Sequence, residues 1–245
     1  MIFRRALSPS RQGSASPTDL RTGDAQTVLL ARRAVPALER SATPATTLGA
    51  ALKRSLDLFG AVFGLVFLSP VLVVIALAIW LDDRGPALFR QDRVGQHGRV
   101  FRIVKFRTMT VDADQMRDEL RAHNEVDGAA FKLTHDPRVT GVGRVLRRFS
   151  LDELPQLWNV LLGQMSLVGP RPHPRDDVER YSDWHFQRLN AKPGMTGLWQ
   201  VSGRRDSSFD RWVEQDIEYI QSWSLWLDIV ILFRTVGVVV SGSGR

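Results

Sequence analysis

The stretch LFGAVFGLVFLSPVLVVIALAIWL, residues 58–81, decides the architecture of this chain. It carries no ionisable side chain, and it is longer than the roughly 18 apolar residues that mark a candidate membrane helix. Ser69 and Pro70 lie at its middle. Proline removes a backbone donor and its ring clashes with the carbonyl four residues earlier, so we expect the helix to break at these two residues.

Basic residues flank this stretch on both sides. Lys53 and Arg54 precede it, and several arginines follow it: Arg84, Arg90, Arg93, Arg99 and Arg102. Positive charge favours the cytoplasmic side of a membrane, and a helix that bends and returns keeps both flanks there. We therefore predict a re-entrant membrane helix over residues 51–83. A kinked helix that crosses the bilayer is the alternative, whereas a buried helix of a soluble protein is disfavoured because the stretch lacks a polar face.

The chain differs in composition on the two sides of this helix. Residues 1–50 are rich in Ala, Ser, Thr, Pro and Arg without a sustained apolar period, which predicts a disordered N-terminal tail. An arm that binds a partner is the alternative for this tail. Residues 84–245 are mixed and polar, and we expect them to form a small cytoplasmic α/β domain that carries the chemistry.

Periodicity predicts the elements of that domain. The residues on either side of Gly95–Gly98 alternate between apolar and polar, which indicates a β-hairpin. Helices are expected over 109–125, from Gly141 onward and over 209–220. The apolar run 225–240, with Trp223 and Trp226 near its start, predicts either an amphipathic helix at the membrane interface or an ordinary core helix.

Composition narrows the function. Lys plus Arg is 33 and Asp plus Glu is 26, and the net charge of +7 suits phosphate-bearing ligands or an anionic membrane. The absence of cysteine excludes disulfides, Cys-ligated zinc, iron–sulfur clusters and thiol nucleophiles. The five histidines show no metal-ligand spacing and no clear pairing with Ser and Asp. A tethered nucleic-acid-binding or scaffold protein is disfavoured, because residues 84–245 lack a strip of alternating aromatic and basic residues.

The richest set of reactive side chains lies between residues 147 and 163. Because Pro155 is tolerated only in the first turn of a helix, a helix should begin close to Ser150–Leu154. Ser150 and Glu153 have the spacing of a capping box. Asp152 and Glu153 would then lie at a helix N-terminus, where the dipole and the free amides favour anions.

These two carboxylates admit two interpretations. They are either first-turn caps, or a metal-holding carboxylate paired with a nucleophile or base. In the second case Arg147 and Arg148 add to the positive field of the helix end. A carboxylate kept ionised in this way can attack phosphorus once a divalent cation neutralises the phosphate oxygens.

Two loops could bind phosphate. Pro170 and Pro172 bracket Arg171 in a rigid segment, which would hold the guanidinium ready for a bidentate phosphate contact; a structural turn is the alternative. Residues 192–205 combine glycines and basic residues with Trp199 and Arg204, which suits a diphosphate or base pocket.

Asp112 and Asp114 form an acidic pair of the kind with which many nucleotide-sugar transferases hold a metal. A solvated helix face is the preferred interpretation of this pair. A glycosyltransferase that uses Asp112 and Asp114, and that would release UDP, remains the rival enzyme hypothesis.

Ordered motifs in this chain resemble those of the bacterial sugar transferase family, the monotopic phosphoglycosyl transferases. The matching stretches are Lys53–Asp57 before the Ser-Pro helix, Lys105–Met109, Ser150–Leu154, Gly169–Pro172, Pro193–Gly197 and Ser202–Arg204. The likeness covers roughly residues 50–240, with the motifs in the expected order.

The resemblance implies transfer of a hexose-1-phosphate from a UDP-sugar to undecaprenyl phosphate, with release of UMP and the start of an exopolysaccharide or other surface glycan. It implies a two-step route in which Asp152 is the nucleophile, Glu153 its partner, and Arg147 and Arg171 essential arginines. It also implies Mg²⁺, held by Asp152 and Glu153, and substrate contacts from Pro170, Pro172, Lys105, Arg204 and Trp199. The expected location is the cytoplasmic face of the bacterial inner membrane, in contact with its lipids, with interfacial amphipathic helices and no nucleic-acid partner. A homodimer is compatible with the sequence.

The chain departs from parts of the family pattern. Large members carry a multi-helix membrane bundle upstream, so this chain resembles the short exopolysaccharide-initiating type. Many small members have Asn-Gly-Arg where this chain has Ser202-Gly203-Arg204. Together with the longer segment between Met109 and Arg138, this favours glucose or galactose over an N-acetylated donor.

Overall fold

The computed structural model describes residues 47–113, 115–120, 123–131, 133–202 and 208–242. It is a mixed α/β structure in which helices surround two separate two-stranded sheets. Most of the tail expected over residues 1–50 lies outside the described residues. Residues 47–50 are helical, so the first helix begins four residues earlier than the expected boundary at residue 51.

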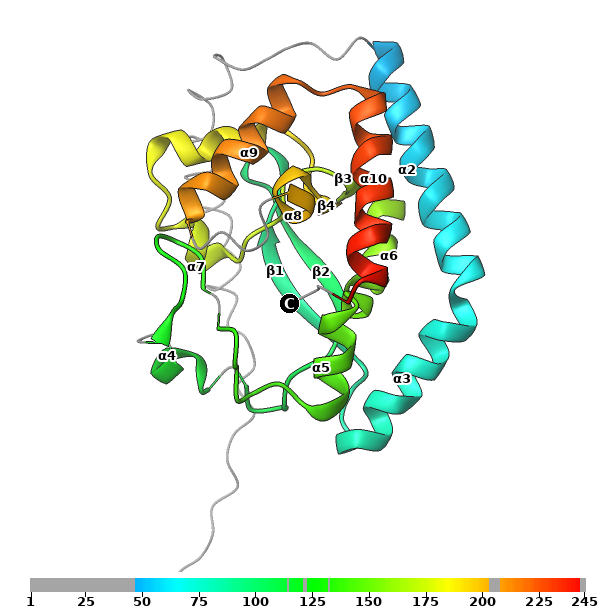
Figure 1. The fold of residues 1–245 in the computed structure, drawn as a ribbon, viewed down its shortest axis with the longest axis vertical. Helices are drawn as coiled ribbons and strands as arrows, with labels where there is room; N and C mark the ends of the chain where they lie inside the picture. The colour runs from blue at the N-terminus through cyan, green and yellow to red at the C-terminus, as the bar shows by residue number, and fades with distance from the viewer. Residues whose placement is uncertain (1–46, 114, 121–122, 132, 203–207, 243–245) are drawn as a thin grey trace, which may run out of the picture.

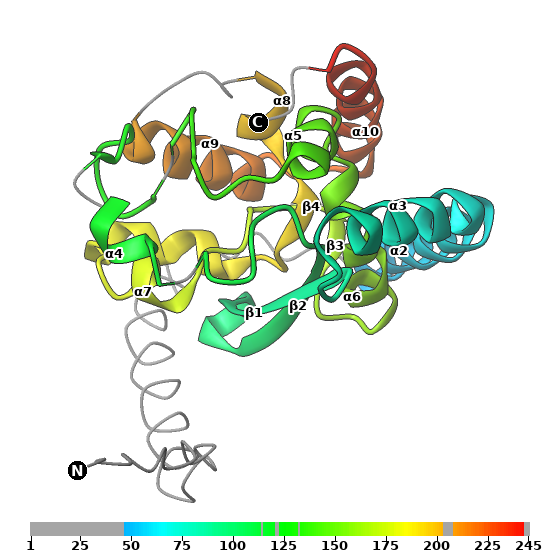
Figure 2. The same ribbon diagram turned by 90° about the horizontal axis from the view of Figure 1, so that it is seen from below.

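The long apolar segment forms two helices, α2 (Thr47–Phe67) and α3 (Ser69–Asp83), which line one side of the molecule (Figures 1 and 2). Their axes bend by 62° at the break between them. Pro70 lies in the first turn of α3, where its missing N–H costs no helical bond, and the Ser69 hydroxyl donates to the Val66 carbonyl at 2.8 Å. The predicted break at Ser69 and Pro70 is thus confirmed.

Neither helix by itself meets the length and apolarity needed to cross a membrane, and the same holds for each other helix of the described residues. Taken together, α2 and α3 do meet that test by length and composition.

The predicted hairpin is confirmed. Strand β1 (Leu88–Val94) pairs antiparallel with β2 (Val100–Phe106), and the short 3-10 helix η1 (Gln96–Gly98) joins them. Leu88 faces Phe106 and Val94 faces Val100 across the ladder. Gly98 has a φ of 75°, a backbone conformation that glycine adopts without steric cost.

Among the described residues of the range 109–125, the expected α-helix is wrong except for one turn, α4 (Arg117–Leu120). Met109 forms an isolated bridge with Val139, and the Thr110 amide donates to the Arg138 carbonyl at 2.9 Å. These contacts hold the start of the segment against residues 138–139 in a non-helical conformation. The segment has the composition of an acidic helix, but backbone pairing with residues 138–139 takes the place of helical hydrogen bonds at its start.

The segment with the two carboxylates follows α5 (Gly141–Arg148). It forms the 3-10 helix η3 (Leu151–Gln156) and continues as α6 (Leu157–Leu161). The predicted helix start is confirmed, with Pro155 inside η3. The predicted capping box is wrong. Ser150 has a φ of 54° in place of the extended backbone that is usual at an N-cap, and no side-chain capping bond joins it to η3.

The remaining elements form a second layer beside the hairpin (Figure 1). In chain order they are β3 (Ser166–Val168), α7 (Arg175–Val178), η4 (Asp183–Asn190), β4 (Gly194–Thr196), α8 (Leu198–Ser202), α9 (Phe209–Gln221) and α10 (Leu225–Val240). Strands β3 and β4 pair in parallel, and the predicted helices near residues 209–220 and 225–240 are confirmed. A buried aromatic core that includes Phe186, Phe209 and Trp212 packs under α9.

The first turns of α2 are bound to α6 and to α10. Arg54 donates to the carbonyls of Val160 and Leu161 at 2.7 and 2.9 Å, and Lys53 contacts Asp228 of α10 at 2.6 Å. The two basic residues that the sequence presents as a membrane flank therefore serve to join α2 to α6 and α10.

Candidate active site

The carboxylates of Asp152 and Glu153 stand in the first turn of η3, surrounded by cationic side chains from other elements. The Arg171 guanidinium donates to Glu153 Oε1 at 2.6 Å, and Lys105 Nζ lies 3.7 Å from the same oxygen. Lys105 comes from β2 and Arg171 from the loop after β3. The fold thus brings four of the predicted residues, Asp152, Glu153, Lys105 and Arg171, into one cluster.

Burial is the largest influence on the pKa values of Asp152 and Lys105 in this cluster. It raises the pKa of Asp152 to about 6, and the neighbouring Glu153 charge adds to the increase, while Lys105, Arg147 and Arg171 oppose it. Burial also lowers the pKa of Lys105 to about 8, with Arg171 acting in the same direction and Glu153 against it. A carboxylate that is poorly solvated but ionised at neutral pH is a competent nucleophile.

Arg147 reaches the site from the last turn of α5. Its Nε donates to the hydroxyl of buried Thr108 at 2.9 Å. Burial lowers the pKa of Arg147, and the charge of Asp152 is the largest influence that raises it, which places the guanidinium within the field of that carboxylate. Sequence reasoning missed Thr108, although it lies inside the Lys105–Met109 motif.

The Thr108 backbone packs directly against Gly143 in α5. Its carbonyl accepts from the Thr140 amide at 3.1 Å, and a Cβ on Gly143 would lie only 2.1 Å from the same oxygen. Glycine at 143 therefore permits the contact, and the Thr108 side chain meets Arg147 one helical turn further along.

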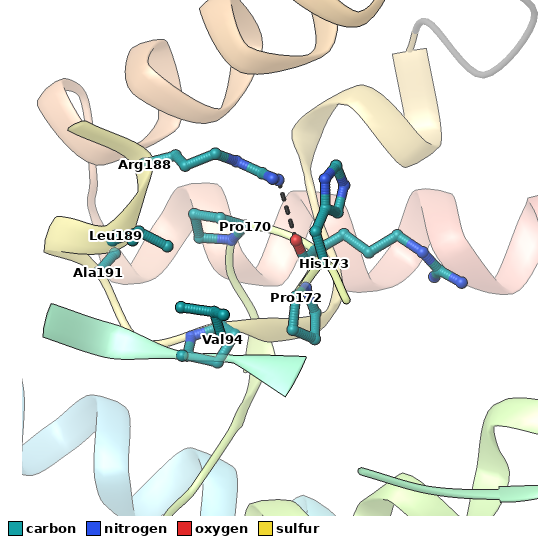
Figure 3. A pocket seen from close by; sticks show the side chains of 10 residues that line it. Val94, Pro170, Pro172, His173, Arg188, Leu189 and Ala191 are labelled. Carbon is teal, nitrogen blue, oxygen red and sulfur yellow. Dashed lines mark hydrogen bonds between the residues drawn. The ribbon is translucent and has the colours of Figure 1, made fainter. Parts of the chain in front are cut away.

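Arg188 binds the backbone of the Pro-Arg-Pro loop (Figure 3). Arg188 Nη2 donates to the Arg171 carbonyl at 2.9 Å, and Arg188, Pro170 and Pro172 line one small cavity. The Gly194 amide donates to the Pro170 carbonyl at 2.9 Å. This bracing fixes the backbone at residue 171 and directs the guanidinium towards Glu153.

Arg188 itself is buried and satisfied by several acceptors. It pairs with Asp216 of α9 and donates to the Tyr181 hydroxyl. Because arginine has no acceptor, the proton of the Tyr181 hydroxyl is not used by Arg188, and His173 Nδ1 lies 3.0 Å from that hydroxyl. Burial lowers the pKa of His173 well below its usual value, and the positive charge of Arg188 acts in the same direction.

The glycine-rich segment has a packing role. A Cβ on Gly194 would lie 2.1 Å from the Gly169 nitrogen, and one on Gly197 would lie 2.6 Å from the Gly169 oxygen. These glycines let β4 approach the loop after β3. Trp199 is buried in the core and stacks on Trp212 at 4.7 Å between ring centroids, so it does not present that face to a base. Arg204 lies outside the described residues.

Asp112 and the histidine His185 lie outside this cluster. Asp112 is exposed, as a solvated residue should be, while Asp114 lies outside the described residues. His185 lies 3.1 Å from the Ser182 hydroxyl and 2.9 Å from Asp210, a contact set that the sequence did not indicate. Ser182 and His185 form a helix cap, since they cap η4 reciprocally, and Asp210 of α9 adds a contact to His185 Nε2.

Among the described residues, no group of three or more His, Cys, Asp or Glu side chains could hold a metal by itself. Asp152 and Glu153 supply adjacent hard oxygen donors. That set suits Mg²⁺, which usually takes one or two protein carboxylates and completes its shell with substrate phosphates and water.

A model of the bacterial sugar transferase family matches residues 48–242. Galactosyl transferase CpsE of Streptococcus agalactiae serotype III (strain NEM316) is 49% identical over 193 residues, covering 78% of this chain and 43% of that protein. Exopolysaccharide production protein ExoY of Rhizobium meliloti (strain 1021) is 42% identical over 201 residues, covering 80% of this chain and 89% of that protein.

UDP-glucose:undecaprenyl-phosphate glucose-1-phosphate transferase of Escherichia coli (strain K12) is 43% identical over 211 residues, covering 82% of this chain and 43% of that protein. The chain spans about two fifths of the length of several curated relatives that it matches. Because the family match extends from α2 to the end of α10, this chain belongs to the bacterial sugar transferase family.

Proposed function

We propose that this protein transfers a hexose-1-phosphate from a UDP-hexose to undecaprenyl phosphate, releases UMP and so begins an exopolysaccharide or related surface glycan. The observation that carries this proposal is the half-buried Asp152–Glu153 pair surrounded by Lys105, Arg147 and Arg171. Relatives named as undecaprenyl-phosphate galactose and glucose phosphotransferases support both the reaction and these two hexoses.

The proposed chemistry has two displacements at one phosphorus. A carboxylate oxygen of Asp152 attacks the β-phosphorus of the UDP-hexose, and the bond to the UMP oxygen breaks with its electron pair leaving on UMP. A phosphate oxygen of undecaprenyl phosphate then attacks the same phosphorus and displaces the Asp152 carboxylate. Undecaprenyl diphosphate hexose is the product, and Asp152 returns to its ionised form.

The surrounding residues offset the negative charge of donor and acceptor. Arg171 and Arg147 are placed to bind phosphate oxygens, and Lys105 adds a third cation. Glu153 and Asp152 would hold Mg²⁺, which would neutralise the diphosphate oxygens. Pro170 and Pro172 keep the Arg171 backbone rigid, so that little conformational entropy is lost when substrate binds.

We further propose that α2, α3 and α10 attach the protein to the cytoplasmic face of the bacterial inner membrane, with α2 and α3 as a re-entrant anchor. Large apolar side chains are exposed on these helices: Phe59, Phe63, Val66, Phe67, Val73, Val74, Trp226, Phe233, Val236 and Val240. Such an apolar surface suits contact with lipid. Trp226 is exposed and could lie among headgroups, whereas Trp223 donates to Asp228 at 3.2 Å and serves the fold.

The reaction is tested by supplying nanodisc-embedded protein with Mg²⁺, undecaprenyl phosphate and either UDP-glucose or UDP-galactose. We expect UMP as the released nucleotide, and a loss of at least about a thousandfold in rate for Asp152→Asn, which lacks the nucleophile. The exposed Asp112→Asn is the matched control and should retain wild-type activity. Release of UDP, or full activity of Asp152→Asn, would contradict the proposal.

A further inference from the structure

The side chain of Asn159 binds the backbone of a strand that carries one of the site's cations. Asn159 lies in α6 and is 1% exposed. Its Oδ1 accepts from the Val104 amide at 3.0 Å, and its Nδ2 donates to the Arg102 carbonyl at 2.8 Å. Both of these backbone groups belong to β2. One side-chain amide therefore joins α6 to β2 at two points.

The orientation of this amide is fixed by its partners. Besides the Arg102 carbonyl, Nδ2 donates to Gln164 Oε1 at 2.7 Å, so both donors of the amide are used. The Asn159 carbonyl also accepts from the amides of Gln164 and Met165 at 3.0 and 3.2 Å. Rotation of the side-chain amide by 180° would place Nδ2 against the N–H of Val104, which costs two buried hydrogen bonds. The amide thus holds α6 at one position along β2.

Apolar packing also joins α6 to β2, but it is less exact. Ile103 of β2 lies in one buried cluster with Leu157 and Val160 of α6. Such contacts depend on the apolar area removed from water and not on direction, so they tolerate small shifts along the strand. Hydrogen bonds require a narrow range of distance and angle. We therefore attribute the register between α6 and β2 to the two bonds of Asn159.

This register decides where Lys105 lies relative to the carboxylate pair. Lys105 directly follows Val104, and Glu153 precedes Asn159 by six residues. The Lys105 side chain is 14% exposed, and its Nζ lies 3.7 Å from Glu153 Oε1. A shift by one residue moves a strand by about 3.3 Å and turns each side chain to the opposite face. Lys105 would then no longer reach Glu153.

The other cation bound to Glu153 is held independently of Asn159. Arg171 enters from the loop after β3, and its carbonyl accepts from Arg188 at 2.9 Å. A change at Asn159 should therefore displace Lys105 and leave Arg171 in place.

We infer that Asn159 is a positioning residue for the proposed reaction, which fixes α6 against β2 and so holds the Lys105 ammonium beside Glu153. This inference rests on the proposed function. In that reaction the ammonium meets a phosphate oxygen of the donor, and a misplacement of about 1 Å in such a contact can slow a reaction about a hundredfold. Asn159 itself touches neither substrate nor metal.

The test is a double-mutant cycle on UMP release by nanodisc-embedded protein supplied with Mg²⁺, undecaprenyl phosphate, and UDP-glucose or UDP-galactose. Asn159→Leu removes both bonds to β2 at similar volume, and we expect kcat/KM for the donor to fall about tenfold. In a Lys105→Met background, which keeps the Asp152 nucleophile, the same substitution should lower kcat/KM less than about twofold. No ammonium remains there to be displaced, whereas a purely structural effect would be the same in both backgrounds.

A second substitution keeps the test open if Asn159→Leu does not fold. Asn159→Asp retains the acceptor for the Val104 amide and loses the donor to the Arg102 carbonyl. It should show a smaller loss of kcat/KM with the same dependence on Lys105. Thermal unfolding of every variant identifies an assay temperature at which all of them are folded.

Asn124→Leu is the matched control. The Asn124 Nδ2 donates to the carbonyls of Val126 and Ala130 at 2.7 and 2.9 Å, so this substitution also removes two bonds from a side-chain amide to the backbone. These bonds contact neither β2 nor the carboxylate pair. We expect kcat/KM to stay within about twofold of the wild-type value.

The outcomes separate this inference from the proposed function. Equal losses with Lys105 and with Met at position 105, full activity of folded Asn159→Leu, or full activity of Lys105→Met would overturn the inference although UMP release stands. If Lys105→Met releases too little UMP to measure, the same cycle and criterion apply to the affinity for the UDP-hexose, measured by titration calorimetry in an Asp152→Asn background. If the wild-type protein releases no UMP from either donor, the proposed function fails and the inference fails with it.

Discussion

Thr108 shows how one neutral hydroxyl can control a charged site. Its hydroxyl accepts one hydrogen bond from Arg147 Nε, which leaves the two terminal guanidinium nitrogens to face the carboxylate or substrate. Thr108→Val removes the hydroxyl at nearly constant volume, and we expect kcat to fall about tenfold with little change in KM.

Thr108→Ser keeps the hydroxyl and is the matched control. We expect it to restore kcat to near the wild-type value, which a purely structural role for the threonine methyl would not do. Full activity in Thr108→Val would show that Arg147 needs no support from this residue.

His173 predicts how stability depends on pH. Because burial and the nearby Arg188 lower the pKa of His173 well below 6.5, the folded protein leaves it neutral while the unfolded chain takes up a proton near that pH. The free energy of unfolding should therefore fall as the pH drops below about 6.5, by about 1 kcal/mol at pH 5.5 from this residue.

His173→Asn has a side chain that cannot be protonated in this range. Between pH 7.5 and 5.5, its free energy of unfolding should decrease less than that of the wild type, as measured by denaturant titration. Equal slopes in the two proteins would mean that His173 is protonated in the folded state.

At the scale of elements, the break between α2 and α3 predicts the topology. If these helices form a re-entrant pair, the start of α2 and the β1 strand must face the same side of the bilayer. The natural chain has no cysteine, so single cysteines at Ala50 and Asp92, both exposed, can report accessibility. We expect a membrane-impermeant thiol reagent to label both from the cytoplasmic side of inverted vesicles.

Pro70→Ala in the same background restores a backbone donor and removes the clash that favours the bend. If the bend depends on proline, Ala50→Cys and Asp92→Cys should become labelled from opposite sides in part of the protein. Labelling from opposite sides in the protein with Pro70 intact would contradict the re-entrant arrangement.

At the scale of the whole molecule, Lys53 and Asp228 connect the apolar helices to the rest of the chain. The Asp228 carboxylate is completely buried and also accepts from the Tyr219 hydroxyl at 2.7 Å. Lys53 donates in addition to the Val168 carbonyl, just before the loop that carries Arg171. Losing one partner of a buried ion pair leaves an uncompensated charge, so Lys53→Met should lower the free energy of unfolding by about 3 kcal/mol.

The double variant Lys53→Met with Asp228→Asn removes both charges and should be more stable than Lys53→Met alone. Thermal unfolding in one detergent gives all terms of the double-mutant cycle. Additive effects of the two substitutions would show that the ion pair does not couple the helices. The exposed pair Arg102 and Asp92 is a suitable control, because solvent leaves such a pair with little energy.

Features encoded in neighbouring residues could be predicted from the sequence. The helix break depends on one proline, the hairpin on local alternation around a short turn, and the carboxylate pair on adjacent positions 152 and 153. Each of these requires only the geometry of a few consecutive residues. The helix expected over 109–125 failed because backbone pairing with residues 138–139 outweighed a weak local preference.

Contacts between distant residues were decided only by the tertiary structure. Arg147 meets Thr108 across 39 positions, and Lys53 meets Asp228 across 175. The glycines and basic residues around Trp199 suggested that its ring stacks on a ligand. The fold instead places the ring against Trp212, because burying two indole rings removes a large apolar area from water. The sequence by itself determined which carboxylates and cations the chain offers, and the packing of α5, β2, η3 and the loop after β3 determined which of them meet.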